Sequence, residues 1–430
     1  MPNHLNDHLP PYPRLGECYR LLAKALDTKA SNRHIDRLAR EGDFDWQLLP
    51  GLREELIETP LRKRSNENFA RFVVAAVETL HDGYVDLVRT IPLDALTRAE
   101  SLPALITHLY APYAASFCLQ MHKAIPSPPI VPLLDECQHP IEVTIAWLER
   151  ELNIAPNQLG HRLYADSTGE NKNGRDALQR WRQGLQLPSL NSINLLRQRL
   201  LSLFPQRERF INAFGEWLIT ARALVVFEQY AAPYLKLRPI ILREVLSDVP
   251  PEDIGVLLSQ LNIQAAANRR SVVESGLLLQ EHLKRTTEKV HGDMRRTRVA
   301  LEEFRQQLVE HDPNSVSAYY LEWLEGRWHV LAGQLEGALA HYEQAADLAL
   351  YRSGETQKGI VREALLLAAY QGDLPLYKRL KHRALAMGLS YLPGWEHSVA
   401  TAKELAMIRG NFEVKFPARG RFVEPGDSRS

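Results

Sequence analysis

Apolar residues recur at three- and four-residue spacing along most of this chain, and strict alternation of apolar with polar residues is rare. Such spacing puts apolar side chains on one face of a helix. Leu, Ala, Arg, Glu and Gln, which favour helices, are frequent in the same segments. The pattern predicts an all-α protein, with N-terminal helices over 14–27, 31–41, 51–58, 66–89 and 100–123, the last broken near Pro112.

The stretch 148–200 has the spacing of a compact helix-turn-helix. Apolar residues four apart mark one helix around 148–152 and another around 159–163, which begins near Pro156, a residue suited to a first helical turn. An irregular polar loop, DSTGENKNG, follows, and a third helix is expected over 175–183. The three helices are close enough in sequence to form one small domain.

Gly184 is placed to cap the third helix, and Pro188 stands four residues later, before another apolar helix. Together with the leucines that follow, this tract, ALQRWRQGLQLPSLNSINLL, resembles the Xre-type helix-turn-helix family, the lambda-repressor class of regulators. Gly160 also falls where that family has a small residue. Two features depart from the family: Ala165–Gly174 lengthens the turn, and Pro156 stands where a phosphate-contacting Gln is frequent.

The resemblance implies that the third helix enters the DNA major groove, because that is how the family docks. The side chains it directs toward bases or phosphates are Arg175, Asp176, Gln179 and Arg180, with Lys172 and Arg182 as further basic contacts. Arg can bridge two guanine acceptors, and Gln can pair with adenine. Residues 172–209 hold eight Lys or Arg against two acidic residues. The alternative is that these arginines are ordinary solvated residues and that the module contacts protein.

A second pattern lies near the C-terminus. The motifs AGQL at Gly333, QGDL at Gly372 and RGNF at Gly410 recur at steps of 39 and 38 residues, a period typical of stacked helical hairpins. The tract LEGRWHVLAGQLEGALAHYEQAADLAL resembles a tetratricopeptide repeat, and the residues at the family's packing positions are Gly326, Gly333, Ala338, Tyr342 and Ala345. The resemblance implies a concave groove for a protein or peptide, or a surface that pairs two copies of the chain.

These patterns, with the helix-breaking segment PSPPIVP, divide the chain into six parts. We expect an N-terminal helical domain at 1–125, a Pro-rich linker at 126–140, the Xre-like helix-turn-helix domain at 141–205, a connecting helical block at 206–275, tetratricopeptide-like repeats at 276–415 and a tail at 416–430. The architecture is therefore that of a multidomain helical protein with a C-terminal array of helical hairpins.

Composition limits the partners. The 430 residues include 52 basic and 52 acidic ones, so attraction to a polyanion must come from a local basic face. The three cysteines are too few and too scattered for a disulfide framework and are expected to be thiols. The first residues lack the apolar core of a secretory signal, and no run of about 18 uncharged apolar residues is present. We expect a cytoplasmic protein without a membrane partner.

No motif for catalysis is found: GxxxxGK[ST], HExxH, GxSxG and a glycine-rich dinucleotide turn are absent. The nearest set of zinc-type ligands is Cys118, His122, Cys137 and His139, but a buried Cys and a surface His explain such residues more simply. We therefore expect a non-enzyme with no metal and no cofactor.

The sequence as a whole predicts a DNA-binding regulator that docks its third helix in the major groove and uses helical repeats for protein binding or dimerisation. The alternative is a non-enzymatic adaptor subunit of a larger complex, in which the helix-turn-helix contacts protein.

Overall fold

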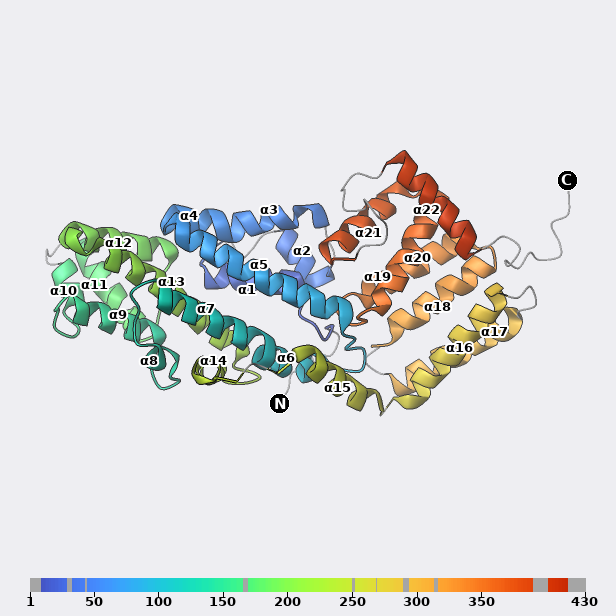
Figure 1. Cartoon of the computed structure of the whole chain (residues 1–430), viewed down its shortest axis with the longest axis horizontal. Coiled ribbons are helices and arrows are strands. Elements are labelled where there is room, and N and C mark those ends of the chain that lie inside the picture. The colour runs from blue at the N-terminus through green and yellow to red at the C-terminus, as the bar shows by residue number, and fades with distance from the viewer. Residues whose placement is uncertain are drawn as a thin grey trace.

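The chain folds into an elongated, all-helical molecule (Figure 1). The computed structural model describes residues 9–28, 33–42, 45–164, 169–249, 252–267, 269–288, 294–312, 316–389 and 401–416, with the backbone alone at 169–172, 286–288 and 405. About 79% of the chain is helical, and no strand is found in the described part. The predicted all-α class is confirmed.

The α-helices, in chain order, are α1 (Leu15–Ala25), α2 (Arg33–Glu41), α3 (Leu49–Arg53), α4 (Thr59–Arg64), α5 (Glu67–Thr90), α6 (Arg98–Leu105), α7 (Ala111–Ala124), α8 (Ile130–Leu134), α9 (Pro140–Glu151), α10 (Leu159–Leu163), α11 (Gly169–Arg182), α12 (Leu190–Leu203), α13 (Glu208–Ala231), α14 (Leu237–Leu246), α15 (Ile254–Ala267), α16 (Arg270–Glu288), α17 (Met294–His311), α18 (Ala318–Leu331), α19 (Leu335–Ala349), α20 (Thr356–Gln371), α21 (Leu374–Ala386) and α22 (Ala402–Lys415). Short 3-10 turns, η2 (Trp46–Leu48) and η5 (Pro205–Arg207), and π-helical segments, η3 (Glu54–Glu58) and η4 (Ile106–Tyr110), join some of them.

Helix α13 is the central element of the N-terminal part. It packs against α1, α9, α12 and α14, and Phe214, Trp217 and Leu218 on it are fully buried. A helix that is apolar on all sides must be enclosed by other helices. The segment 206–275, expected to be a connecting block, therefore holds the core helix of the parts before it.

The proline-rich segment 126–140 is held firmly against this core. The Trp217 indole donates to the Pro126 carbonyl at 3.1 Å, and the Arg238 guanidinium donates to the carbonyls of Asp135 and Gln138, each at 2.7 Å. The segment also contains α8. One continuous buried cluster extends from Tyr12 to Phe416, so this segment does not separate two cores.

Residues far apart in sequence join the two halves of the molecule. The Tyr351 hydroxyl accepts the Leu15 amide N–H at 3.2 Å, and the Tyr351 carbonyl accepts the Tyr12 amide N–H at 3.3 Å. Gly354 has φ +52°, and a Cβ on it would lie 2.5 Å from the Pro92 nitrogen. The loop between α19 and α20 can fit against the N-terminal half only with glycine at this position.

Two details of the predicted helices are wrong. The helix over 98–124 is not broken at Pro112, because the π-helical segment η4 directly before it accommodates the ring and the missing N–H. The polar stretch before the third helix is largely helical, since α11 begins at Gly169. Only residues 165–168 of that stretch lie outside the described residues.

The C-terminal half is a stack of antiparallel helices in which α18 packs on α19, and α20 packs on α19, α21 and α22 (Figure 1). Gly333 and Gly372 have φ of +77° and +79° and end α18 and α20, where a left-handed residue is needed. Gly410, the third predicted turn, lies inside α22 instead. The 39-residue period therefore marks two turns, not three.

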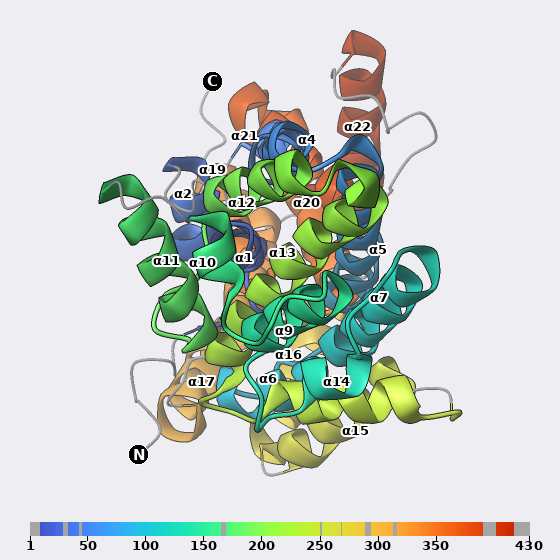
Figure 2. The ribbon, with the colours of Figure 1, turned by 90° about the vertical axis from the view of Figure 1, so that its left-hand side faces the viewer.

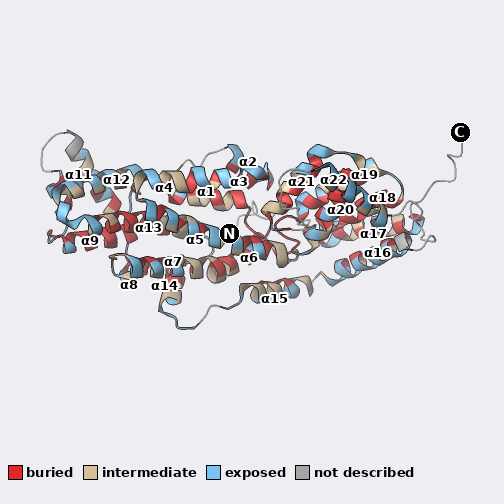
Figure 3. Ribbon diagram, turned by 45° about the horizontal axis from the view of Figure 1, so that its top comes forward, coloured by how far each residue is buried: buried red, intermediate tan, exposed pale blue. Residues whose placement is uncertain are grey.

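By length and composition alone, two helical stretches, Arg98–Ala124 and Pro205–Ala231, are apolar enough to cross a membrane. Core helices of soluble proteins pass the same test, and 72% of the apolar window of the second stretch is already buried by its neighbours, against 39% of the first. Figure 3 shows the burial along these helices.

A buried carboxylate ties four helices of the C-terminal stack together. Glu363 of α20 accepts the Trp323 indole N–H and the Tyr342 hydroxyl, each at 2.8 Å, and pairs with Arg327 at 2.8 Å and Lys415 at 2.7 Å. Burial alone would raise the pKa of Glu363, but Arg327 and Lys415 outweigh burial and lower this pKa to about 2. The carboxylate is thus ionised and has partners on α18, α19 and α22.

We expect Glu363→Gln to lower the free energy of unfolding by about 3 kcal/mol, because Arg327 is left largely buried without its anion. The folded pKa lies below the ordinary value of 4.5, so the stability that this carboxylate contributes is complete above about pH 5.5 and is lost as the pH falls toward 2. The variant should lack this acid dependence in urea unfolding followed by circular dichroism.

The matched control is Glu274→Gln, which removes a carboxylate from an exposed pair with Arg270 on α16. Its unfolding should match that of the unmodified protein. Equal losses in the two variants would contradict a special role for Glu363.

Candidate nucleic-acid interface

The segment expected to be a helix-turn-helix contains α9, α10, α11 and α12, which lie at one end of the molecule (Figure 2) and are called the module below. Helix α11 packs against α9 and α10, while α9 and α12 pack on α13. Leu178 and Trp181 of α11 are buried, and Gly184 has φ +69° and ends the helix, as predicted. The module is therefore attached to the core through its first and fourth helices, and α11 lies outermost.

Glu149 of α9 organises the turn of this module. Its carboxylate, 3% exposed, accepts the backbone N–H groups of Asn157 and Leu159, at 3.2 and 3.1 Å. The same carboxylate pairs with Arg182 of α11 at 2.6 Å. Glu149 thus fixes the start of α10 and the end of α11 at the same time.

Arg182, expected to contact DNA, is turned inward. Its guanidinium is 8% exposed, pairs with Glu142 at 3.0 Å as well as with Glu149, and donates to the Asn157 side-chain oxygen at 2.8 Å. Partial burial raises the pKa of Glu142 even though Arg182 lies beside it. The structure therefore gives Arg182 a structural role, and does not leave it on the outer face.

The outer face of α11 carries the remaining expected contacts. Asp176, Gln179 and Arg180 are exposed, whereas Arg175 is half-buried and lies against α10, where a Cβ on Gly160 would be 3.5 Å from its Cγ. A Cβ at this distance makes an ordinary van der Waals contact, so the approach of the two helices does not depend on glycine at position 160. The side chain of Lys172 lies outside the described residues.

The other basic residues of 172–209 do not gather on one face. The Arg197 guanidinium points inward and donates to the Ser65 carbonyl and to the side chains of Asn194 and Asn212. The Arg199 guanidinium lies 4.5 Å from the centre of the Tyr164 ring. Fewer than the eight Lys and Arg residues of 172–209 therefore contribute positive charge to the outer surface of the module.

Helix α12 is anchored by a buried arginine of α13. The Arg222 guanidinium donates to the Pro188 carbonyl at 3.1 Å, and to the carbonyls of Lys24 and Ala25 at the end of α1, at 2.8 and 3.0 Å. Asp27, two residues after the end of α1, accepts the Leu190 amide N–H at 3.2 Å. These contacts fix the start of α12 relative to the core.

The expected repeat positions all lie in the α18–α19 hairpin. Ala338, Tyr342 and Ala345 of α19 are completely buried, and a Cβ on Gly326 would come within 3.2 Å of the Tyr342 ring. The Tyr342 hydroxyl reaches Glu363 on α20. These residues pack helices against one another, and none of the three buried ones is available to a partner.

One group of side chains has the spacing of a metal site. Ligand atoms of Glu325, His329 and His341 lie within 4.8 Å of one another. The Glu325 carboxylate, however, is already paired with Arg298 and Arg305, which neutralise it and repel a cation. The group is therefore better explained as a buried ion pair beside two stacked imidazoles, whose ring centres are 4.9 Å apart.

The zinc-type residues considered from the sequence are not assembled in the described part of the chain. Cys118 is buried among apolar residues, whereas Cys137 is exposed. His122 bonds the Ser127 hydroxyl at 2.5 Å, and His139 lies against Gly184. Each side chain thus has a separate structural environment.

No family model matches the chain, and no curated protein or solved structure matches it significantly.

Sequence reasoning missed Glu142 and Glu149, which hold the module together. The sequence did indicate that these two carboxylates need partners, because each lies next to an apolar residue, Val143 or Leu148, that is buried on the same helix. A carboxylate on an apolar helix face requires a partner. Arg182 is this partner for both carboxylates.

We expect Arg182→Ala to lower the free energy of unfolding by about 3 kcal/mol, since Glu149 remains buried without its cation. Arg180→Ala, which removes an exposed arginine from the same helix, is the matched control and should change stability by less than about 0.5 kcal/mol. Hydrogen exchange followed by mass spectrometry should show the loss of protection in α9–α11. Full protection of these helices in Arg182→Ala would contradict the structural role.

Proposed function

We propose that this protein is a DNA-binding regulator that places α11 in the major groove. The observation that carries the proposal is that α11 is the outermost helix at one end of the molecule and has an uncovered, polar outer face (Figure 2). Gln179 and Arg180 on this face have the donors and acceptors that read adenine and guanine. The uncovered face supports docking, because no other described helix covers it.

The rigidity of the module supports the same proposal. Base readout requires side chains held in a fixed position relative to the backbone contacts. Glu149 and Arg182 fix α11 on α9, and Arg222 fixes α12 on the core. The chain carries no net charge, so long-range attraction to DNA is weak, and a large share of the affinity for DNA must come from direct contacts of the module.

The test is selection of bound sequences from a pool of genomic DNA fragments, at several salt concentrations, with the full chain. We expect a discrete enriched sequence and an affinity that falls as salt rises. Gln179→Ala/Arg180→Ala should lose this sequence with a decrease in affinity of at least about tenfold, as expected for lost base contacts.

The matched control is Gln229→Ala/Arg243→Ala, which removes the same residue types from exposed positions on α13 and α14. It should bind as the unmodified protein does. An absence of enrichment, or weak binding that is equal in both double variants, would contradict DNA readout.

Exposed apolar residues favour a second candidate, an adaptor that acts through protein contacts. Val273 and Leu277 lie one turn apart on α16, Leu278 follows, and Ile263 on α15 is 68% exposed (Figure 3). Water-exposed apolar residues clustered on neighbouring helices are typical of protein interfaces. The C-terminal helices would then pair two protomers or hold a partner through these exposed residues of α15 and α16.

We expect the protein to sediment as a dimer and Leu277→Glu/Leu278→Glu to sediment as a monomer, because two charges would have to be buried in the interface. The control, Val414→Glu, adds a charge at an exposed apolar position of α22 and should leave the dimer intact. A monomer at all concentrations of the unmodified protein would exclude pairing through α16.

A further inference from the structure

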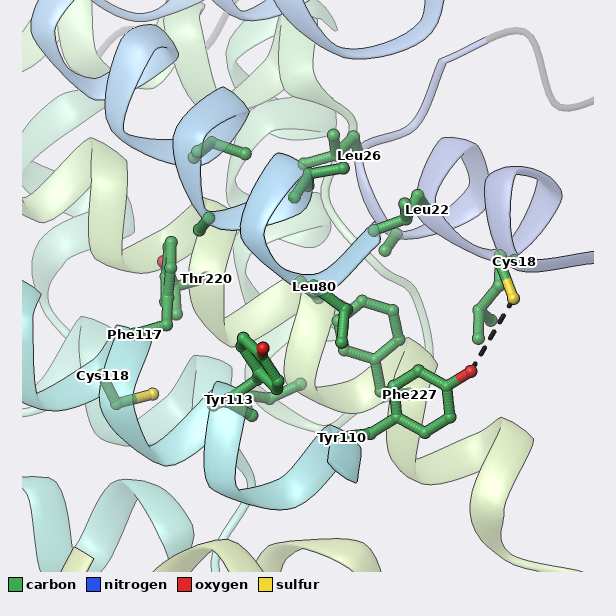
Figure 4. A pocket seen from close by; sticks show the side chains of 18 of the residues that line it. Cys18, Leu22, Leu26, Leu80, Tyr110, Tyr113, Phe117, Cys118, Thr220 and Phe227 are labelled. Carbon is green, nitrogen blue, oxygen red and sulfur yellow. Dashed lines mark hydrogen bonds between the residues drawn. The ribbon is translucent and has the colours of Figure 1, made fainter. Parts of the chain in front are cut away.

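An apolar cavity of about 390 Å³ lies between α1, α5, α7 and α13. Figure 4 shows the side chains around it: Leu22 of α1 and Leu26 directly after this helix, Leu80 of α5, Phe117 of α7 and Phe227 of α13. We propose that this cavity binds one small, uncharged, apolar molecule.

The size of the cavity sets the size of the ligand. An engineered protein cavity of about 150 Å³ holds benzene, and small-molecule sites usually measure about 300 to 1,000 Å³. The cavity therefore has room for a compound about two to three times as large as benzene. A cavity of this size between close-packed helices is too large to be an ordinary packing defect.

The chemistry of the walls sets the polarity of the ligand. Glu17 is the only acidic residue of the lining, and Arg98 engages its carboxylate at 3.1 Å. The Thr220 hydroxyl already donates to the Glu216 carbonyl at 3.0 Å. A charged ligand would lose its hydration here without gaining a partner, so an uncharged one is favoured.

Two thiols also face this space, Cys18 and Cys118 (Figure 4). Burial raises the pKa of each to about 12, so both are neutral at physiological pH. The Cys18 sulfur contacts the Tyr110 hydroxyl at 3.8 Å. The thiols thus add no charge to the cavity, and Cys18, which is partly exposed, serves as a reporter of its occupancy.

The cavity has a route to solvent between α5 and α7. Thr79 on α5 and Gln120 on α7 line it and are exposed, whereas Phe72 and Phe117 beside them are half-buried with ring centres 4.8 Å apart. Water that reaches such walls finds few polar partners. An apolar ligand that replaces this water gains the hydrophobic free energy of the walls.

The experiment is titration of the full chain with the uncharged fluorophore N-phenyl-1-naphthylamine. We expect one bound probe per chain. Ala223→Phe on α13 and Ala76→Phe on α5 each put a ring into the cavity from a different wall, and each should weaken binding at least tenfold. Ala340→Phe, at an exposed position of α19, is the matched control and should bind as the unmodified chain does.

A second measurement does not depend on the folding of any variant. Prolonged N-ethylmaleimide labelling of the unmodified chain at pH 9, followed by peptide mass spectrometry, should slow at least fivefold at the partly exposed Cys18 when the probe is bound. Cys137, which is exposed and lies outside the cavity, is the internal control and should react at an unchanged rate.

Three outcomes would overturn the proposal. The first is the absence of saturable binding. The second is probe binding that is unchanged in both phenylalanine variants, once circular dichroism has shown that they are folded, and that is lost in Leu277→Glu/Leu278→Glu. The probe would then bind the α16 surface and not the cavity. The third is labelling of Cys18 at the same rate with and without probe. None of these outcomes depends on whether the protein binds DNA.

Discussion

The burial of α13 on all sides is the constraint on which the rest of the structure depends. Each large apolar side chain on it that leaves water stabilises the fold by about 1.5–3 kcal/mol. Only helices from several parts of the chain can enclose it, and α1, α9, α12 and α14 do so. The module of α9–α12 and the apolar cavity both pack on or include α13, so the two proposed sites share one support.

Buried charges specify how the surrounding helices meet. Glu149, Glu325 and Glu363 are each almost fully buried, and each pairs with an arginine from another helix. Such pairs contribute little net stability compared with apolar residues of the same size, but a helix placed in the wrong register would leave one of these charges without its partner. In this chain they lie at the turn of the module and at the centre of the stacked hairpins.

The sequence predicted the helical class, the positions of α11 and α12, and the hairpin of α18 and α19, because these follow from local spacing and from glycines in left-handed turns. It did not predict the large core that extends from Tyr12 to Phe416, since the contacts of α13 come from residues distant in sequence, nor the smaller separate core among α16, α17 and α18. The inward orientation of Arg182 was missed for the same reason. A residue type indicates what contact a side chain can make, whereas the fold decides which partner is within reach.

The cavity could not be predicted from the sequence, because each residue that lines it, taken singly, looks like an ordinary core residue.

The junction at Tyr351 has a consequence for the synthesis of the protein. Leu15 and Tyr351 are separated by 336 residues, and at about 5–20 residues per second the ribosome needs roughly 20–70 s to make the intervening chain. During this time the N-terminal segment lacks the loop that covers it, and α1 exposes apolar surface that is later enclosed. Contacts this distant in sequence also slow the final folding step. The N-terminal half therefore cannot complete its packing until α19 and α20 have emerged from the ribosome.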